Sequence, residues 1–468
     1  MESGEKISST SLDGKVPLQK MSLDGKVPLQ KMSLDGKVPL CVIGVGFIGL
    51  HLVEILANDK RFTVCGYDIS RERISYLQQN NDKENVTFQS TLDGLENTEL
   101  FIIAVSNGRN AVKDELDLQN IINVKLLLEK IAKVGSTIII ESTMYVGGTR
   151  ELFSNFVDKN IHVCYSPERL DSCRKSPSFK EIPKIISGLT NKSLDKIREY
   201  YSPVFDTCIS VTSVETAEMC KLYENCFRLV NIAYTNEIAD MCRDLQIDTN
   251  EMISACNTKP YGFMTFYPGL GVGGKCLPNN PYYLMRDKKY SLSILQKSCS
   301  FLELRPYVKA CDVLKNQEFK RILILGLGFK TGESKIFNSP SVCFAYSLIK
   351  CNRFVRCYDP TVQRTILPKF ANFIDFIHLD NYNTNYINEN FDTVIIAIKQ
   401  TDIDYTILNT NKWQVPMPRP PVCINTAPCK VCPSDSSNYP VNLKQWDDSR
   451  YVTQSKINKK WSDDQARA

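Results

Sequence analysis

The sequence predicts an α/β protein with two Rossmann-like, doubly wound domains joined by a central helical region used for dimerisation. Three observations predict this architecture. An apolar run, VPLCVI, is followed by the glycine-rich turn GVGFIG and then by apolar residues at helical spacing. A second apolar run, RILIL, is followed by a similar turn, GLGFK. Between the two units, at about 213–310, apolar residues recur every three or four positions, which is typical of long amphipathic helices.

Length and composition are those of a water-soluble globular protein. The 468 residues leave room for two to four domains, and 43% hydrophobic with 23% charged residues is an ordinary balance. The net charge of +5 comes from 57 basic and 52 acidic residues without a long basic run, so neither a nucleic acid nor a membrane is expected as a partner. No run reaches the roughly 18 apolar residues that a membrane-spanning helix needs, and no secretory signal is visible.

The cysteines favour a reducing environment. There are 18 of them, scattered singly rather than spaced as a disulfide framework. The one close pair, Cys429 and Cys432, has no second pair or histidine at zinc spacing, so no metal site is predicted. We therefore expect a cytoplasmic protein in which most thiols are small buried side chains.

The amino-terminal segment repeats itself. SLDGKVPLQKM occurs twice and SLDGKVPL a third time within residues 11–40, and glycine and proline in each copy oppose a helix. The third copy runs into the first strand, so the chain from Met32 reads like an original start with duplicated copies ahead of it. We interpret the repeats as disordered sequence, with a binding tail as the alternative. The predicted segments are a disordered tail (1–37), a first Rossmann domain (38–212), a central helical domain with a cysteine loop (213–312), a second Rossmann-like domain (318–430) and a disordered tail (431–468).

The first glycine turn fits a dinucleotide. Gly44 allows the tight turn, Gly46 lets the backbone approach a pyrophosphate, and Gly49 lets helix and strand pack closely. The phosphates would lie at the helix amino terminus, where free N–H groups and the helix dipole favour an anion. Asp68 ends the next apolar run, and a carboxylate there accepts from the ribose hydroxyls and repels a 2′-phosphate. The cofactor is therefore predicted to be NAD rather than NADP, with a purely structural glycine turn as the alternative.

The second unit repeats the beginning of the first. Strands are predicted at LFIIAVS (100–106) and STIIIEST (136–143) in the first half, and at VRCYDP and FDTVIIAIK in the second. Gly326 and Gly328 repeat the opening of the first turn, but the third glycine is missing, and Lys330 and Thr331 follow Phe329 instead. A helix would pack less closely there, and a lysine can meet a phosphate instead.

One cysteine stands in unusually permissive backbone. In FYPGLGVGGKCLPNNPYYL, residues 266–284, Cys276 follows several glycines and precedes prolines and asparagines. Such backbone lets another group come close to the thiol while leaving it exposed. The loop therefore singles out Cys276 as the cysteine that another group must approach closely.

Taken together, these motifs resemble the UDP-glucose/GDP-mannose dehydrogenase family. The resemblance covers about residues 38–430 and is carried, in order, by GVGFIGL, EST (141–143), YSPERLD (165–171), IPKIISG (182–188), KLYENCFRLVNIAYTNE (221–237), the cysteine loop, and GLGFK with SP (339–340). The cysteine loop and ESTMYVGG are most similar to the branch that oxidises UDP-N-acetylhexosamines (glucosamine or mannosamine), whose loops read GVGGHCIP and ESTxYPG. The UDP-glucose branch more often has GFGGSC. The resemblance implies NAD as cofactor, a UDP-sugar as substrate, a role in polysaccharide biosynthesis, and a homodimer or higher homo-oligomer.

The resemblance also implies a reaction. Family members oxidise the C6 alcohol of the sugar to a carboxylate in two hydride transfers to two NAD molecules, through a thioester on the loop cysteine, here Cys276. Lys221 and Asn225, one helical turn apart, would stabilise negative charge on the sulfur and on the sugar oxygen. Glu168 would act through water as the base that hydrolyses the thioester, and Thr143 would position that water.

Further site residues carry over by their position in the motifs. The predicted cofactor site comprises Gly44, Gly46, Phe47, Ile48, Gly49, Asp68, Arg73, Ser106 and Thr143. The predicted substrate site comprises Glu168, Arg169, Lys221, Asn225, Tyr267, Gly271, Gly273, Phe329 and Lys330. Within it, Tyr267 and the glycines would line the uridine and the sugar. Phe329 and Lys330 would hold the diphosphate from the second Rossmann-like domain, across a subunit boundary.

Several positions depart from the family pattern. Asn280 stands where family members carry a catalytic aspartate, and Phe337 where an arginine is usual. Lys275 replaces the histidine before the cysteine, and AVSNG (104–108) replaces an AVPTP loop beside the nicotinamide. The loss of a positioned general base costs about 10²- to 10⁴-fold in rate.

Three functions are therefore weighed. We expect the first, a working NAD-dependent nucleotide-sugar 6-dehydrogenase. The second is a paralogue that binds nucleotide sugar or NAD in a regulatory or structural role with little or no oxidation; Asn280 and Phe337 favour it, whereas the retained Cys276 and Lys221 oppose it. The third is an ordinary two-electron dehydrogenase of the 2-hydroxyacid type, which would need neither Cys276 nor a second nucleotide-binding half.

Overall fold

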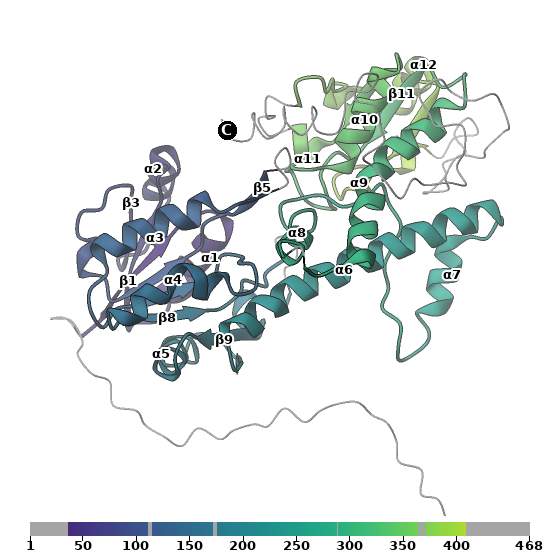
Figure 1. Cartoon of the computed structure of the whole chain (residues 1–468). Coiled ribbons are helices and arrows are strands. Elements are labelled where there is room, and N and C mark those ends of the chain that lie inside the picture. Colours follow the sequence, from purple (N-terminus) through teal and green to yellow (C-terminus); the bar gives the residue numbers. More distant parts are fainter. Residues whose placement is uncertain are drawn as a thin grey trace, which may run out of the picture.

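The computed structural model of the chain describes residues 36–110, 115–171, 176–287, 289–363, 367 and 371–408. The predicted tail at 431–468, the pair Cys429 and Cys432, and the tail at 1–37 except its last two residues lie outside the described residues. Figure 1 shows two α/β bodies connected by a long helix, α6 (Val214–Asp244). Across the part of the chain that the structure describes, no helix is long and apolar enough to cross a membrane.

The first body is built on a sheet with strand order β10-β9-β8-β7-β4-β1-β2-β3. Every adjacent pair is parallel except β8 and β9. The strands are β1 (Val38–Ile43), β2 (Phe62–Tyr67), β3 (Val86–Gln89), β4 (Leu100–Ile103), β7 (Thr137–Ile140), β8 (His162–Tyr165), β9 (Lys184–Gly188) and β10 (Cys208–Ser210). The central strands β4 and β7 are entirely apolar or buried, as strands covered by helices on both faces must be, and both confirm strands predicted from the sequence.

Helices cover both faces of this sheet. They are α1 (Phe47–Ala57), α2 (Arg71–Gln79), α3 (Gln119–Ile131), α4 (Gly148–Asp158), α5 (Asn191–Tyr201) and the 3-10 helices η1 (Leu95–Asn97) and η2 (Phe179–Glu181). One apolar core contains Leu52 of α1 and Ile197 of α5, and the other contains Ile121 of α3 and Phe153 of α4. Val214, the first residue of α6, is buried in the second core. The long helix is therefore anchored in the first body. A short hairpin, β5 (Gly108–Asn110) with β6 (Glu115–Asp117), follows β4.

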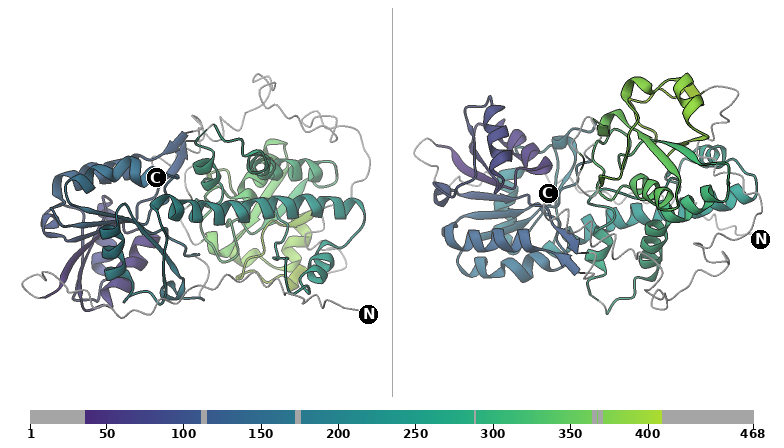
Figure 2. Two further views of the ribbon diagram at one scale, coloured as in Figure 1. Left: turned by 60° about the horizontal axis from the view of Figure 1, so that its bottom comes forward. Right: turned by 90° about the horizontal axis from the view of Figure 1, so that it is seen from above.

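The central helical region consists of α6, α7 (Thr249–Cys256), α8 (Asn280–Leu284) and α9 (Ser293–Leu314). Ser213 begins α6 by accepting a hydrogen bond from the backbone N–H of Thr216, and no proline interrupts the helix up to Asp244. α6 packs against α9 through an apolar cluster that includes Leu229 and Leu302. Figure 2 shows α6 extending from the first body along the second.

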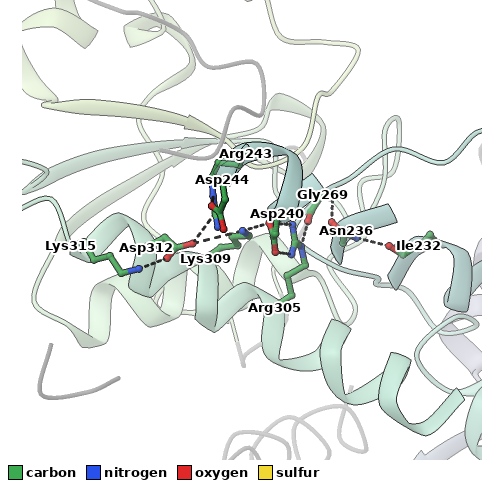
Figure 3. Close-up of polar contacts among 10 residues, drawn as sticks. All are labelled: Ile232, Asn236, Asp240, Arg243, Asp244, Gly269, Arg305, Lys309, Asp312 and Lys315. Atoms are coloured by element: carbon green, nitrogen blue, oxygen red, sulfur yellow. Dashed lines mark hydrogen bonds and ion pairs between the residues drawn. The ribbon is translucent and has the colours of Figure 1, made fainter. Parts of the chain in front are cut away.

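A polar network holds α6, α9 and the start of the cysteine loop together (Figure 3). Asp240 of α6 accepts from Arg305 Nη1 at 2.7 Å and from Lys309 Nζ at 2.6 Å. Arg305 Nε also donates to the Gly269 carbonyl oxygen at 2.6 Å, and the Gly269 N–H donates to Asn236 Oδ1 at 2.9 Å. The loop that leads to Cys276 is thus fixed at its base by both helices.

The second body has a parallel sheet of order β12-β11-β13. Its elements are β11 (Arg321–Leu325), β12 (Phe354–Tyr358), β13 (Thr393–Ile396), α10 (Pro340–Lys350), α11 (Pro360–Gln363), α12 (Thr384–Asn390), η4 (Leu379–Asn381) and η5 (Thr406–Leu408). The predicted order of strand, glycine turn and helix is corrected here, because no helix follows the turn directly. The chain runs on from Lys330 to Pro340, whose ring suits the first turn of α10.

Candidate active site

The first glycine turn is open where a phosphate would lie. Gly44 has a φ of +92°, and a Cβ there would lie 2.9 Å from the Ala104 carbonyl oxygen. A Cβ at Gly49 would lie 1.8 Å from the Gly44 carbonyl oxygen, so only glycine lets α1 pack this closely on the turn. At Gly46, in contrast, an added Cβ would meet no atom within 4 Å. α1 begins at Phe47, and its first N–H groups have no carbonyl partner within the helix, so they are available to an anion.

Asp68 lies at the end of β2 beside this turn. Its Oδ2 accepts from the Val45 N–H at 3.0 Å, and its Oδ1 accepts from the Ser70 N–H at 2.9 Å. Arg73 Nε donates to the Val45 carbonyl oxygen at 3.0 Å. Each carboxylate oxygen keeps a second lone pair for a ribose hydroxyl. Together with the half-buried Ile48, these residues fit the adenosine side of a dinucleotide.

The segments after β4 and after β7 are joined at the carboxyl edge of the sheet. Ser142 Oγ donates to the Val105 carbonyl oxygen at 2.8 Å, and Asn107 Nδ2 donates to the Thr143 carbonyl oxygen at 3.0 Å. In the first segment, Ser106 lies between Val105, which accepts one of these bonds, and Asn107, which donates the other. In open α/β sheets, ligands bind outside the carboxyl ends of the strands, so Ser106 and Thr143 lie where the nicotinamide side of a dinucleotide is expected.

A polar face of α6 points toward the segment that carries Glu168. Lys221 and Asn225 are 6% and 9% exposed, and both lie on this face because residues four positions apart share one side of a helix. Lys221 Nζ donates to the backbone oxygen of Glu168 and lies 3.3 Å from its Oε2. Lys221 and Glu168 therefore form an ion pair at the junction of α6 and the first body.

Behind Glu168 lies a buried charged pair. Lys184 Nζ donates to Glu141 Oε2 at 2.5 Å, and Tyr201 Oη donates to Glu141 Oε1 at 2.7 Å. Burial raises the pKa of Glu141, and the positive charge of Lys184 opposes that rise. The Glu168 N–H lies 3.4 Å from the Glu141 carbonyl oxygen. This pair fixes the backbone from which Glu168 projects.

Cys276 begins the turn that leads into α8. Its carbonyl oxygen accepts from the N–H groups of Asn279 at 3.1 Å and Asn280 at 2.9 Å. The residue is exposed at the mouth of the site, although protein surrounds its thiol on most sides. Burial raises the pKa of the Cys276 thiol, the positive charge of Lys221 lowers it, and the negative charge of Glu168 raises it. The charges of Lys221 and Glu168 therefore act on the thiol in opposite directions.

The amide of Asn280 is held by a second amide. Asn225 Nδ2 donates to Asn280 Oδ1, and Asn280 is 4% exposed. An amide at this place orients its neighbours by hydrogen bonding, but it cannot take a proton at neutral pH.

The second body closes over the cysteine loop. A Cβ at Gly273 would lie 2.5 Å from the Cβ of Phe329, and a Cβ at Gly271 would lie 3.1 Å from the Leu302 carbonyl oxygen. These two glycines, predicted to line the sugar, thus face the second body and α9. Lys330 Nζ donates to the Asp171 carboxylate of the first body. The loop glycines are required by contact between protein segments, and Lys330 links the two bodies.

Two of the positions that depart from the family pattern, Lys275 and Phe337, lie together. Lys275 Nζ lies 4.9 Å from the centroid of the Phe337 ring, and the Gly274 N–H donates to the Phe337 carbonyl oxygen at 2.8 Å. Lys335 Nζ lies 5.9 Å from the ring centroid of Phe47, the first residue of α1. Lys335 therefore brings the second body next to the start of α1.

Two predicted substrate residues lie at other places. Arg169 Nη2 donates to Glu224 Oε1 at 2.6 Å, and its Nη1 donates to the Pro183 carbonyl oxygen at 2.8 Å. Tyr267 is 63% exposed on the loop before Cys276. Arg169 ties its segment to α6, and Tyr267 presents its ring to solvent.

Three charged residues near the site were missed in the sequence. Arg228 adds a positive charge that lowers the pKa of Cys276, and its spacing of three from Asn225 on the same helix was a usable signal. Asp171 and Lys335 come from loops of different bodies, so no local pattern could have brought them to the site.

Comparison with known proteins agrees with this geometry. Sequence models of the UDP-glucose/GDP-mannose dehydrogenase family match the chain twice, the NAD binding domain at residues 38–205 and the central domain at residues 215–298. A UDP-N-acetyl-D-mannosamine dehydrogenase of Methanococcus vannielii is 27% identical over 407 residues, covering 80% of this chain and 94% of the relative. A UDP-N-acetyl-D-glucosamine 6-dehydrogenase of Pseudomonas aeruginosa is 30% identical over 357 residues, covering 69% and 83%. A solved structure of a UDP-D-ManNAc dehydrogenase from Pyrococcus horikoshii is 25% identical, covers 78% of this chain and 90% of its own, and has a TM-score of 0.69.

Proposed function

The chain belongs to the UDP-glucose/GDP-mannose dehydrogenase family and is an NAD-dependent oxidoreductase, and from this premise we propose that it is a nucleotide-sugar 6-dehydrogenase. Its substrate is a UDP-sugar, either a UDP-N-acetylhexosamine or UDP-glucose, whose C6 alcohol is oxidised to the uronate through a thioester on Cys276. The observation that carries the proposal is an exposed thiol within electrostatic reach of both Lys221 and Glu168. The named relatives that act on UDP-N-acetylhexosamines support that sugar class first.

The side chains of this site have distinct tasks in such a reaction. NAD, when bound, supplies the electron acceptor for each of two oxidations. Lys221 stabilises the negative charge on the sugar oxygen as the alcohol becomes an aldehyde. The Cys276 sulfur then adds to the aldehyde carbon while the thiol proton passes to the aldehyde oxygen, which gives a thiohemiacetal, and oxidation of this thiohemiacetal leaves a thioester. Glu168 takes a proton from the attacking water, the C–S bond breaks, and the thiol is released with the carboxylate. One sugar and one water are consumed for two NADH formed.

The raised pKa of Cys276 is compatible with this sequence of steps. Burial favours the neutral thiol before substrate binds, and the positive charge of Lys221 stabilises the negative charge that the sulfur acquires as it attacks. Glu168 lies beside Lys221 at 3.3 Å, so proton transfer from water to Glu168 would leave the lysine free to support the departing charge. Thr143, near the carboxyl edge of the sheet, is proposed to position the water.

A homodimer or higher homo-oligomer in the cytoplasm completes the proposal. Along α6, several large apolar side chains are exposed in the single chain: Met219, Tyr223, Phe227, Tyr234 and Met241. A contiguous exposed apolar surface of this kind indicates a protein partner, and a second copy of the chain is the partner that the resemblance implies.

A second candidate function is a paralogue that binds the nucleotide sugar or NAD without completing oxidation, in a regulatory or structural role. It is favoured by the amide pair of Asn225 and Asn280, because neither amide can act as a general base. It is also favoured by Phe337, whose ring lies under Lys275. It is opposed by the placement of Cys276, Lys221 and Glu168 within reach of one another.

A substrate panel tests these alternatives. UDP-glucose, UDP-N-acetylglucosamine, UDP-N-acetylmannosamine and GDP-mannose would each be mixed with NAD, with absorbance of NADH followed and the sugar acid counted. The proposal predicts two NADH per acid with a UDP-sugar. No NADH with any sugar, together with measurable binding, supports the paralogue. One NADH per sugar supports an ordinary alcohol dehydrogenase and would contradict the thioester.

A further inference from the structure

A clamp links the hairpin after β4 to the helix that follows Cys276. The Arg109 guanidinium of β5 lies over the Tyr282 ring of α8, with its Cζ 3.2 Å from the ring centroid. Tyr282 Oη donates to Glu303 Oε1 of α9 at 2.7 Å, and Arg109 Nη1 lies 3.5 Å from the same oxygen. Cation, ring and carboxylate therefore hold β5 of the first body against α8 and α9 of the central helical region.

The next residue of α8 makes a second connection to the same hairpin. Tyr283 Oη donates to the Gly108 carbonyl oxygen at 3.3 Å. Its ring is 3% exposed and packs with Tyr145, which follows the segment of Thr143, and with Leu222 of α6. Two successive tyrosines thus fix α8 to the first body.

The other side of α8 reaches the reactive loop. Its first residue, Asn280, donates its N–H to the Cys276 carbonyl oxygen at 2.9 Å and accepts through its side chain from Asn225. α8 spans only Asn280–Leu284, so it moves as a single turn. A displacement at Tyr282 is therefore passed to the backbone of Cys276.

The hairpin also adjoins the first glycine turn. A Cβ at Gly44 would lie 3.0 Å from the Val105 side chain, which shows how closely the segment leading into the hairpin packs on that turn. Two residues further along, Asn107 is bonded to the Thr143 backbone. A dinucleotide bound at the turn would therefore lie beside the segment that leads to Arg109.

We propose that Arg109 is a positioning residue that couples occupancy of the first glycine turn to the placement of Cys276. It acts through Tyr282 and Glu303 and touches no reacting atom. The inference rests on the proposed function, since it takes the turn as the NAD site and Cys276 as the nucleophile. It goes beyond that function by assigning the communication between them to one side chain.

The test measures Cys276 reactivity in the full-length protein. Alkylation by iodoacetamide, with and without saturating NAD, is followed by mass spectrometry of the Cys276 peptide. In the wild type we expect NAD to change the rate by about fivefold or more, the lower part of ordinary coupling between sites. In Arg109→Ala the change should fall below about twofold, and Arg109→Lys, which keeps a cation at the ring, should restore part of it.

A matched control removes a different ion pair between the two regions. Arg150 of α4 donates through Nε to Glu215 Oε1 of α6 at 2.6 Å, and neither partner of this ion pair belongs to α8. Arg150→Ala should keep the full NAD effect. An undiminished NAD effect in Arg109→Ala would overturn the proposal, and so would a wild type that binds NAD by calorimetry without any change at Cys276.

Failure of the proposed function has a different signature. If calorimetry shows no NAD binding, the assignment of the first glycine turn as the cofactor site is wrong. If Cys276→Ser still forms the sugar acid, the assignment of Cys276 as the nucleophile is wrong. Either result overturns the coupling together with its premise. An undiminished NAD effect on alkylation in Arg109→Ala, in contrast, contradicts only the role of Arg109 and does not bear on the proposed dehydrogenase activity.

Discussion

The two glycine turns of the molecule begin with the same residues and end in different structures. In the first, the carboxylate of Asp68 takes one amide of the turn and the space beside Gly46 is open. In the second, a Cβ at Gly328 would lie 2.1 Å from the Glu333 carbonyl oxygen, and the Asp359 carboxylate accepts from the N–H groups of Leu327 and Gly328. A glycine pattern therefore predicts a tight turn, whereas what packs on the turn decides whether a phosphate can enter it.

The helix that follows each turn explains the difference. Gly49 lets α1 start within the first turn, and this leaves helix N–H groups at the opening. The second turn has Thr331 in that position, and the chain instead folds back so that Gln400 and Glu333 fill the space beside Gly328. We infer that the second body contributes to ligand binding through side chains such as Lys330 rather than through its turn.

The largest expected effect separates the two aspartates. Asp359→Ala leaves buried amides of the second turn without an acceptor, at about 1–3 kcal/mol for each, so we expect a loss of about 3 kcal/mol or more in the free energy of unfolding. Asp68→Ala leaves one part-buried amide, that of Val45, without its acceptor, so it should cost less stability than Asp359→Ala; it should weaken NAD binding about tenfold and reduce the preference for NAD over NADP. Chemical denaturation and calorimetry measure the two effects. Equal affinity of the wild type for NAD and NADP would sink the assignment of Asp68.

A matched pair of glycine substitutions sharpens the comparison further. Gly328→Ala places a methyl group against backbone and should destabilise the protein by about 2–3 kcal/mol through overpacking. Gly46→Ala has extended backbone and free space, so the melting temperature should not move. Its methyl group should instead keep the pyrophosphate from the backbone and weaken NAD binding by about tenfold to a hundredfold. If Gly46→Ala bound NAD normally, the first turn would not be the phosphate site.

A rise in pH should weaken the junction of α6 with the first body. Glu218 of α6 accepts from the N–H groups of Gly147 at 2.6 Å and Thr149 at 2.8 Å, and burial raises its pKa from 4.5 to about 7. A raised pKa means that the folded state holds the proton more tightly. The stabilisation from Glu218 is therefore complete below pH 4.5 and is lost as the pH rises through about 7.

Between pH 6 and 8 the contribution of Glu218 to the free energy of unfolding should fall by about 1 kcal/mol, the smallest of the expected effects. The junction of the cysteine loop with the second body has neutral bonds, such as that from Asn338 Nδ2 to the Gly274 carbonyl oxygen at 3.0 Å. We therefore expect the amide hydrogen-exchange rate, divided by the intrinsic rate at the same pH, to rise with pH at residues 147–149. At residues 337–338 this ratio should stay constant. Glu218→Gln should remove the pH dependence; its persistence in that variant would assign it to another group.

Local pattern predicted the parts of the molecule that are local in the chain. The strands, the first turn and the helical face with Lys221 and Asn225 follow from spacing, because neighbours in sequence are neighbours in space there. The filled second turn could not be predicted, since Glu333 and Gln400 reach it from separate loops. The same holds for the pairing of Asn225 with Asn280, whose side chains come from different elements.

The site as a whole shows the same division. The sequence singled out Cys276 from the composition of its loop, but the glycines around it turned out to meet Phe329 and α9. The clamp at Arg109 was not foreseen at all, because it joins a hairpin to a helix far along the chain.

The most direct measurement is intact-protein mass spectrometry after mixing with UDP-sugar and NAD. Asn280 cannot act as a base, so hydrolysis depends on Glu168, and we expect a sugar adduct on Cys276 to accumulate. Asn280→Asp should shorten the life of the adduct and raise turnover by about tenfold or more, and Cys276→Ser should form neither adduct nor acid while still binding the nucleotide sugar. Brisk acid formation without an adduct, unchanged by Asn280→Asp, would contradict the proposed role of Asn280, and acid formation by Cys276→Ser would contradict the thioester itself.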